Sequence, residues 1–227
     1  MRRLWLFDLD GTLADTDRDI REAWKATLAD LSLDCPNFER DFVAGPPIED
    51  MARTLLPDAY TDDLGALLRK GFGEHYDHDG FPNTYEYPGI LDRVRELKAS
   101  GALVAIATNK RYVGARLMAE KFGWFDVFDG VFAGDMLATG DPAETTDILA
   151  RAGLAENPGK MKKPALVALV MRLYGTAPES CTLVGDTKSD FIAAKENGIH
   201  SVGVAWGYGT PSELALADRV VDSPSQI

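Results

Sequence analysis

Short hydrophobic runs recur along the chain, separated by longer stretches of mixed polarity. Leu4–Phe7 ends abruptly at Asp8, and later runs at 102–107, 181–184 and 201–205 also break off sharply. Hydrophobic residues at consecutive positions are typical of a strand that is covered on both faces, because alternation with polar residues arises where one face meets water. These runs therefore predict the buried strands of a parallel sheet.

Helical spacing fills the stretches between these runs. Hydrophobic positions three or four residues apart predict helices over 90–97 and 166–173. Gly101 and Gly175 are expected to end these helices, and Pro164 suits the first turn of the second one. Right-handed crossovers between parallel strands place such helices on both faces of the sheet. We therefore predict an α/β fold with a doubly wound, Rossmann-like core.

Residues 15–86 show helical spacing throughout and no strong strand pattern. The stretch is too long for a connecting loop, so we expect a helical cap domain inserted after the first strand. Thr12–Asp15 and the Pro/Gly-rich stretch 80–89 are the expected hinges. The predicted domains are an α/β core, formed by 1–14 and 87–227, and the helical cap of 15–86.

The net charge of −12 argues against large anionic partners, although a small anion can still bind at a helix N-terminus or a metal ion. Such a surface repels nucleic acid and anionic membranes, and the sequence has no basic cluster that would override the repulsion. The N-terminal hydrophobic run is too short for a signal peptide, and no later run approaches the length of a membrane span. Cys35 and Cys181 lack metal-site spacing, so reduced thiols are expected. We predict a cytoplasmic monomer or homodimer that binds neither nucleic acid nor membrane.

Acidic residues follow two of the predicted strands directly. Asp8-Leu9-Asp10-Gly11-Thr12 comes after the first strand, and Gly185-Asp186-Thr187-Lys188-Ser189-Asp190 comes at the end of a later one. The carboxyl ends of parallel strands share one edge of the sheet, so we expect Asp8, Thr108 and Asp186 to meet there. The sequence therefore predicts a cluster of carboxylates in one crevice.

Such a cluster requires a cation, and its oxygen ligands favour Mg²⁺ over zinc. Gly11 would let the backbone turn sharply beneath a ligand. Two simpler interpretations stay open at this point. Asp10-Gly11 is also the sequence of a hairpin turn with solvated acids, and Asp186 and Asp190 also suit a helix cap and its first turn.

The order of these motifs resembles that of the haloacid dehalogenase superfamily, in its phosphatase branch, and the resemblance covers nearly the whole chain. Residues 15–86 are similar to the mobile helical cap of its phosphoglycolate phosphatase-like members. Residues 45–48, 88–89 and 202–209 resemble a subgroup that includes phosphoglycolate phosphatases and 5′-nucleotidase-like proteins. The four matching motifs are Asp8–Thr12, Thr108-Asn109, Lys163-Pro164 and Gly185–Asp190.

The resemblance implies a role for each residue of these motifs. Asp8 is the expected nucleophile, which would form an aspartyl-phosphate. Asp10 is the expected acid and base, which would protonate the leaving group and then take a proton from water. The residues expected to contact the substrate phosphate are Gly11, Thr12, Thr108, Asn109 and Lys163, of which Lys163 would neutralise developing charge.

The resemblance also implies a Mg²⁺ site. The expected ligands are the carboxylates of Asp8 and Asp186 and the backbone carbonyl of Asp10, and Asp190 would orient bound water.

The position of the lysine has an open alternative. A helix is predicted to begin at Asp141-Pro142-Ala143-Glu144, as an N-cap, a first-turn proline and a capping-box glutamate, and to end near Gly153. The family usually has only a short loop here, so the 134–160 segment makes the alignment ambiguous. Lys162 is the alternative to Lys163.

The function implied is that of a Mg²⁺-dependent phosphatase, which hydrolyses a small soluble phosphate monoester similar to phosphoglycolate or a nucleotide. One alternative is a phosphosugar mutase, which would return the phosphoryl group from the same aspartyl-phosphate to a sugar. Another is a phospho-accepting signalling module, which has no use for a lid. Arg53 and Lys110 are interpreted as surface charges rather than as substrate contacts.

Overall fold

A six-stranded sheet lies at the centre of the computed structural model, which describes residues 2–78 and 80–227. Its strands are β1 (Leu4–Phe7), β4 (Leu103–Thr108), β5 (Val131–Ala133), β6 (Cys181–Gly185), β7 (His200–Val204) and β8 (Arg219–Val221). All neighbouring pairs are parallel, in the order β5-β4-β1-β6-β7-β8. Leu4 lies opposite Leu103 on one side and Cys181 on the other. The chain therefore starts in the middle of the sheet and extends it outward in both directions, which confirms the predicted doubly wound fold.

The two edge strands, β5 and β8, were not expected from the hydrophobic pattern. Each spans three residues, and β5 lies between Gly130 and Gly134. A segment this short carries no periodicity, so its strand conformation depends on pairing with the neighbouring strand.

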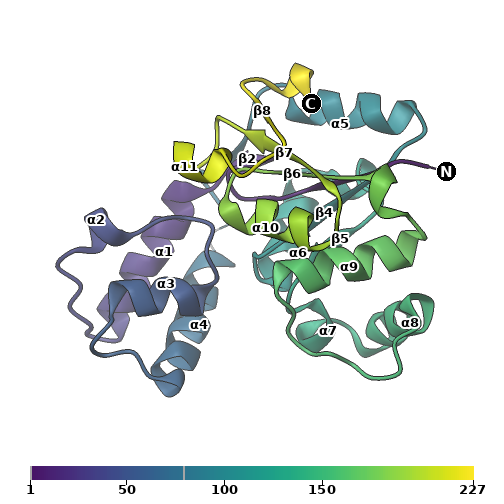
Figure 1. Cartoon of the computed structure of the whole chain (residues 1–227). Coiled ribbons are helices and arrows are strands. Elements are labelled where there is room, and N and C mark those ends of the chain that lie inside the picture. The colour runs from purple at the N-terminus through teal and green to yellow at the C-terminus, as the bar shows by residue number, and fades with distance from the viewer. Residues whose placement is uncertain (1, 79) are drawn as a thin grey trace.

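Helices cover both faces of the sheet (Figure 1). α5 (Ile90–Ala99) and α6 (Tyr112–Lys121) contribute to the hydrophobic cluster on one face, and α9 (Lys163–Tyr174) and α10 (Lys188–Glu196) to the cluster on the other. The predicted helices over 90–97 and 166–173 are therefore confirmed as α5 and α9. No helix in the part of the chain that the structure describes has the length and hydrophobicity needed to cross a membrane.

Glycines follow both predicted helix ends. Gly175 caps α9 with φ 59°, and Gly101 has φ 90° directly after Ser100, which caps α5. The short helices on the remaining connections are η1 (Trp124–Asp126), η2 (Pro178–Ser180), α11 (Pro211–Leu214) and η3 (Pro224–Gln226).

The residues between 15 and 86 form a group of helices at one side of the sheet (Figure 1). These are α1 (Asp17–Asp30), α2 (Phe38–Asp41), α3 (Ile48–Leu55) and α4 (Asp62–Tyr76). Where the chain enters and leaves this group of helices, β2 (Ala14–Asp15) and β3 (Tyr85–Glu86) pair as an antiparallel ribbon. We call residues 15–86 the helical insertion.

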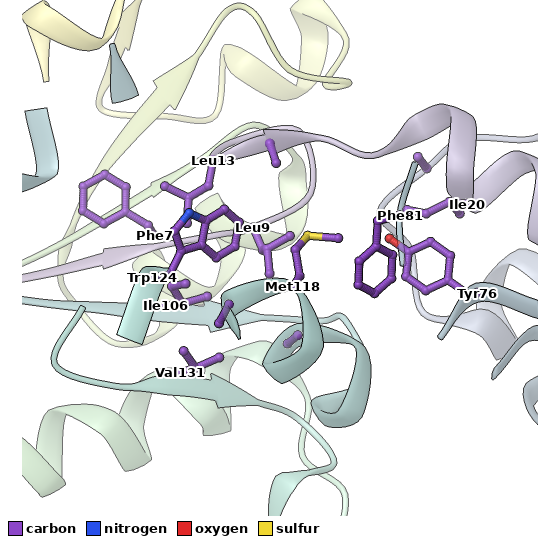
Figure 2. Close-up of a cluster of buried hydrophobic side chains, with 14 of the residues drawn as sticks. Phe7, Leu9, Leu13, Ile20, Tyr76, Phe81, Ile106, Met118, Trp124 and Val131 are labelled. Atoms are coloured by element: carbon purple, nitrogen blue, oxygen red, sulfur yellow. The ribbon is translucent and has the colours of Figure 1, made fainter. Parts of the chain in front are cut away.

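One buried hydrophobic cluster continues from the sheet into the helical insertion. Met118 of α6 lies between the side chains on the sheet and Phe81 and Tyr76, which belong to the insertion (Figure 2). The Tyr76 and Phe81 rings are 4.9 Å apart, centroid to centroid. The helical insertion therefore shares hydrophobic packing with α6 and does not rest on the β2–β3 ribbon alone.

The 134–160 segment contains α7 (Met136–Thr139) and α8 (Pro142–Ala152). As predicted, Asp141 caps α8 by accepting hydrogen bonds from two backbone N–H groups, and Gly153 ends the helix. The predicted capping-box role of Glu144 is wrong, because its carboxylate instead accepts a hydrogen bond from the Tyr112 hydroxyl. The Met161 N–H donates to the Gly134 carbonyl at 2.6 Å, so the segment leaves and rejoins the sheet at one place.

Candidate active site

Three buried carboxylates meet at the carboxyl edge of the sheet. Asp8 directly follows β1, and Asp186 directly follows β6, its neighbour. Asp190 lies in the first turn of α10. One oxygen atom from each carboxylate lies within 4.8 Å of the other two. The expected meeting of acids at this edge therefore occurs, and Thr108 lies there as well, as the last residue of β4.

Lys163 is the cation of this cluster. Its Nζ lies 2.8 Å from Asp8 Oδ2 and forms a second ion pair with Asp190 Oδ1, and its side chain is 2% exposed. Burial alone would lower the pKa of Lys163, but the charges of Asp190 and Asp8 raise it above its ordinary value. Lys162, the alternative left open by the sequence, is exposed at the N-cap of α9. The structure therefore places Lys163, and not Lys162, among the acids.

The second oxygen of Asp190 is held by its own helix. Thr187 donates to Asp190 Oδ2 from its backbone N–H and from its hydroxyl group, both at 3.1 Å. The sequence left open Asp186 as the helix cap with Asp190 in the first turn; Asp190 does lie in the first turn, but the N-cap is Thr187, which forms a capping box with Asp190. Asp190 therefore takes part in capping α10 and anchors Lys163 at the same time.

Asp186 is fixed by two donors from distant parts of the chain. The Thr12 hydroxyl donates to Oδ1 at 3.1 Å, and the Tyr208 backbone N–H donates to Oδ2 at 2.7 Å. The Thr12 hydroxyl therefore holds Asp186 in this structure, and its expected phosphate contact stays a prediction. Gly11 turns with φ 77°, and a Cβ atom there would lie 2.2 Å from Asp186 Oδ2. The expected sharp turn at Gly11 is therefore present, packed directly against the carboxylate.

The cluster has more negative than positive charge. Burial raises the pKa of Asp8 to about 6, with a further rise from Asp190 and an opposing effect of Lys163. Burial, followed by the charges of Asp190 and Asp8, also raises the pKa of Asp186 well above its ordinary value. Asp8 Oδ1 is buried and has no hydrogen-bond partner among the described residues. A buried carboxylate oxygen without a partner is costly, so this donor set fits a divalent cation with oxygen ligands.

Asp10 lies beside the cluster and is held through one oxygen. Its Oδ1 accepts a hydrogen bond from the Thr16 hydroxyl at 2.8 Å and lies 2.9 Å from Lys110 Nζ. The Lys110 side chain is 6% exposed, and its Nζ also donates to the Tyr76 hydroxyl at 2.7 Å. The interpretation of Lys110 as a surface charge is therefore wrong. Its position two residues after a strand end, at the same edge as the acids, was the available signal.

Arg53, the other side chain interpreted as a surface charge, fits that interpretation. Its side chain is 52% exposed and lies near Asp50 and Asp62.

The expected phosphate contacts Thr108 and Asn109 lie at the end of β4. The Thr108 hydroxyl accepts a hydrogen bond from the Lys110 N–H, and the Asn109 side chain donates to the Ser189 hydroxyl, both at 3.1 Å. The first contact lies within the turn after β4, and the second connects that turn to the start of α10.

A cavity of about 680 Å³ opens over this edge of the sheet, between the core and the helical insertion. Asp10, Asn109 and Lys163 contribute to its wall from the core, and Trp24 and Phe72 from the insertion. A small molecule bound there would contact Asp10 and Lys163 at one side and the insertion at the other, so the arrangement suits chemistry on a small anionic substrate.

Comparison with known proteins identifies the family. The model of the haloacid dehalogenase-like hydrolases matches residues 3–198. The chain belongs to this family. A phosphoglycolate phosphatase from Pseudomonas putida is 31% identical over 234 residues, which cover 97% of this chain and 76% of that protein. A probable phosphatase, IndB, from Dickeya dadantii is 28% identical and covers 100% of this chain and 92% of its own. Membership and these relatives indicate that this haloacid dehalogenase-like hydrolase is a phosphoric monoester hydrolase.

Solved structures agree on the fold. A predicted phosphatase from Clostridium acetobutylicum superposes with a TM-score of 0.81 at 22% identity, covering 100% of this chain and 96% of that one. The CbbY protein from Rhodobacter sphaeroides superposes with a TM-score of 0.76 at 24% identity, with 100% and 96% covered. The fold of the whole chain is therefore shared with these solved structures.

Proposed function

We propose that this hydrolase is a Mg²⁺-dependent phosphatase that cleaves a small phosphate monoester through an aspartyl-phosphate on Asp8. The observation that carries the proposal is the buried ion pair of Lys163 with Asp8 and Asp190, beside Asp186 and within reach of the cavity. It supports the proposal because a carboxylate, a buried cation and oxygen atoms that suit a divalent metal lie close together.

Residues of this chain suffice to hold the metal. The carboxylates of Asp8 and Asp186 and the backbone carbonyl of Asp10 are the proposed ligands, and the unpartnered Asp8 Oδ1 is the atom most in need of one. Mg²⁺ bound there would offset the charge between Asp8 and the substrate phosphate. Asp190 supports the site by holding Lys163.

Lys163 is needed because the substrate phosphate and the Asp8 carboxylate are both negatively charged. Two unit charges of the same sign about 4 Å apart repel by roughly 4 kcal/mol at an effective dielectric constant near 20. A dianionic phosphate therefore cannot approach Asp8 unless cations stand beside it. Lys163 is already in place, since two acids raise its pKa and keep it charged.

In the first step, an Asp8 carboxylate oxygen bonds to phosphorus while the bond between phosphorus and the ester oxygen breaks. Asp10 gives its proton to the departing oxygen, so the alcohol leaves neutral. Thr16 and Lys110 both contact Oδ1 of Asp10, so we assign proton transfer to Oδ2. In the second step, Asp10 takes a proton from water as the water oxygen attacks phosphorus, and the bond to Asp8 breaks to release phosphate.

The substrate that we propose is a phosphate ester of the size of phosphoglycolate or a nucleotide. The cavity of about 680 Å³ accommodates either. The relative from Pseudomonas putida, which matches nearly the whole chain, is named a phosphoglycolate phosphatase. Assay of phosphoglycolate, nucleoside monophosphates, sugar phosphates and pyrophosphate with Mg²⁺ would rank these candidates.

The mechanism is tested by trapping the intermediate. Borohydride reduces an aspartyl-phosphate, and mass spectrometry of the peptide containing Asp8 would report the reduced side chain during turnover. Asp8→Asn should abolish both the adduct and phosphate release, whereas Asp10→Asn should slow turnover by roughly 10²- to 10⁴-fold. Asp92→Asn, an exposed acid on α5 paired with Arg95, is the control. An active enzyme with no adduct at Asp8, or one that releases no stoichiometric phosphate, would contradict the proposal.

A further inference from the structure

A second group of charged side chains lines the same cavity. Arg69 comes from α4 in the helical insertion, and Lys160 comes from the end of the 134–160 segment. Both pair with the carboxylate of Glu49, near the start of α3, and Lys160 Nζ lies 3.0 Å from each of its oxygens. Three separate parts of the chain therefore meet around a single carboxylate.

This arrangement shows how a carboxylate fits between the two cations. Glu49 is 25% exposed in its side chain, against 30% for Arg69 and 49% for Lys160. The group is thus open to the cavity and not sealed within the packing. One oxygen of Asp135 lies 3.9 Å from Arg69, and the other accepts a hydrogen bond from the Tyr112 N–H. Asp135 is therefore held by α6 of the core.

Burial disfavours the charged form of both side chains. Burial lowers the pKa of Lys160, and the charge of Arg69 lowers it further, against an opposing effect of Asp135 and Asp50. Burial also lowers the pKa of Arg69, with Asp135 opposing and Arg111 adding to the effect. Crowded cations in a cavity favour an anion beside them.

From this geometry we propose that Arg69 and Lys160 form a second anion subsite, whose occupant in this structure is the carboxylate of Glu49. The proposal rests on the proposed phosphatase function and adds the substrate class: a phosphate ester that carries a second anionic group, either a carboxylate or another phosphate. When such a substrate binds, its second anion takes the place of Glu49 on the two cations. The ester phosphate then lies toward Lys163 and Asp10, which line the same cavity.

The test compares esters that differ only in the second anion. Phosphooxy carboxylates of two to four carbons, the first of which is phosphoglycolate, are matched with ethyl, propyl and butyl phosphate. The bisphosphates of the corresponding diols form a third series, which distinguishes a carboxylate from a phosphate as the second anion. The three lengths cover the span between the subsite and the reacting phosphate.

Wild-type enzyme should prefer one of the two series with a second anionic group over the alkyl phosphates, by about tenfold or more in kcat/KM, because charged hydrogen bonds are strong. Lys160→Met and Arg69→Met should each remove most of this preference through a higher KM, with alkyl phosphate turnover nearly unchanged. Glu49→Gln should do the reverse and lower the KM of the preferred series, since the competing carboxylate is gone. Arg151→Met, which removes an exposed charge from α8 in the same segment, should change neither series.

Each outcome decides between the alternatives. Equal turnover of matched esters by the wild type would overturn the subsite, as would equal losses on both series in the Lys160 and Arg69 variants. A raised KM in Glu49→Gln would show that Glu49 itself binds substrate, which also overturns the proposal. Turnover of p-nitrophenyl phosphate with Mg²⁺ reports the phosphatase function separately, so its absence would count against the function and not the subsite. Circular dichroism of each variant establishes that it is folded.

Discussion

The hydroxyl group of Tyr208 accepts a hydrogen bond from the backbone N–H of Thr16 at 2.6 Å, although 192 residues separate the two in sequence. The same oxygen accepts the Asp17 N–H at 2.9 Å and donates to the Asp15 carboxylate at 3.0 Å. Thr16 in turn donates to Asp10. Tyr208 therefore holds the chain where it first enters the helical insertion. Through Thr16 it also holds Asp10, the residue that we propose transfers the proton.

Tyr208→Phe should consequently weaken both the fold and catalysis. The Thr16 and Asp17 N–H groups each lose their hydrogen bond to the hydroxyl, although Asp17 keeps a second acceptor in the Asp15 carboxylate. We expect this to cost about 1–2 kcal/mol in the free energy of unfolding. We expect kcat to fall roughly tenfold or more as Asp10 loses its fixed position, with a smaller change in KM.

Tyr85→Phe is the matched control for this variant. The Tyr85 hydroxyl donates to the other oxygen of Asp15, but Tyr85 is exposed, and the hydrogen bonds from the Thr16 and Asp17 N–H groups go to Tyr208 instead. Urea denaturation and steady-state kinetics of both variants check the prediction. Similar losses in the two would show that Tyr208 acts only through Asp15.

Neighbouring lysines at the start of α9 should behave very differently when replaced. Lys163→Met leaves Asp8 and Asp190 buried without their cation, so we expect a large loss of activity, roughly 100-fold or more, and destabilisation of about 3 kcal/mol in metal-free protein. Lys162→Met removes an exposed charge and should retain nearly full activity and stability. Phosphate-release assays and chemical denaturation in EDTA measure both effects. Comparable losses in the two variants would contradict the assignment of Lys163.

The hydrophobic pattern predicted those strands and helices whose conformation depends on their own local sequence. The runs that form β1, β4, β6 and β7 are long enough to show a strand covered on both faces, and α5 and α9 carry their own end signals. The short edge strands carry none, because three residues show no period and only pairing defines them.

The part of the site that lies directly at strand ends could be predicted from the sequence. Acids directly after β1 and β6 must share an edge in any parallel sheet, so their meeting follows from topology. The choice between Lys162 and Lys163 depends on which way the first turn of α9 faces, and a one-residue difference rotates a side chain by about 100°. The burial of Lys110 and the link from Tyr208 to Thr16 depend on contacts across 34 and 192 residues. The position of Lys110 after β4 indicates which edge of the sheet it lies at, but no local pattern specifies the contacts themselves.

Removal of metal should abolish turnover. EDTA eliminates the ion that we propose offsets charge between Asp8 and the phosphate, and added Mg²⁺ should restore activity fully. Ca²⁺ should inhibit, because its larger and more flexible coordination shell can hold the Asp8 carboxylate in an unproductive geometry. Phosphate release after chelation and re-addition of each ion measures this. Full activity in EDTA would refute the metal site.

The effect of Mg²⁺ on stability should depend on pH. Burial raises the pKa of Asp8 from 3.8 to about 6. A group with a raised folded-state pKa contributes stability that is present below the unfolded value, and this stability is lost as the pH rises through about 6. Below that pH, Mg²⁺ must also displace the proton to bind. The gain in Tm from Mg²⁺ over EDTA should therefore be larger at about pH 7.5 than at about pH 5.

Scanning calorimetry at both pH values, with and without the ion, measures this gain. Asp8→Asn lacks the titrating group and should show a smaller gain that varies less with pH. An equal gain in Tm at the two pH values in the wild type would contradict a role for Asp8 in binding the ion.

A methyl group at Gly11 should disable the site without unfolding the protein. Gly11 has φ 77°, and a Cβ atom there would lie 2.2 Å from Asp186 Oδ2 and 2.9 Å from the Tyr208 ring. Gly198, after α10, has φ 64° and open space around its Cβ position, so Gly198→Ala carries the backbone strain alone. Both alanine variants should lose about 1–2 kcal/mol of stability from the left-handed backbone. Only Gly11→Ala should also weaken Mg²⁺ binding and lower kcat, because Asp186 must move away from the methyl group. Isothermal titration with Mg²⁺ and steady-state kinetics compare the two variants, and matching Mg²⁺ affinities would show that the position of Asp186 does not govern the site.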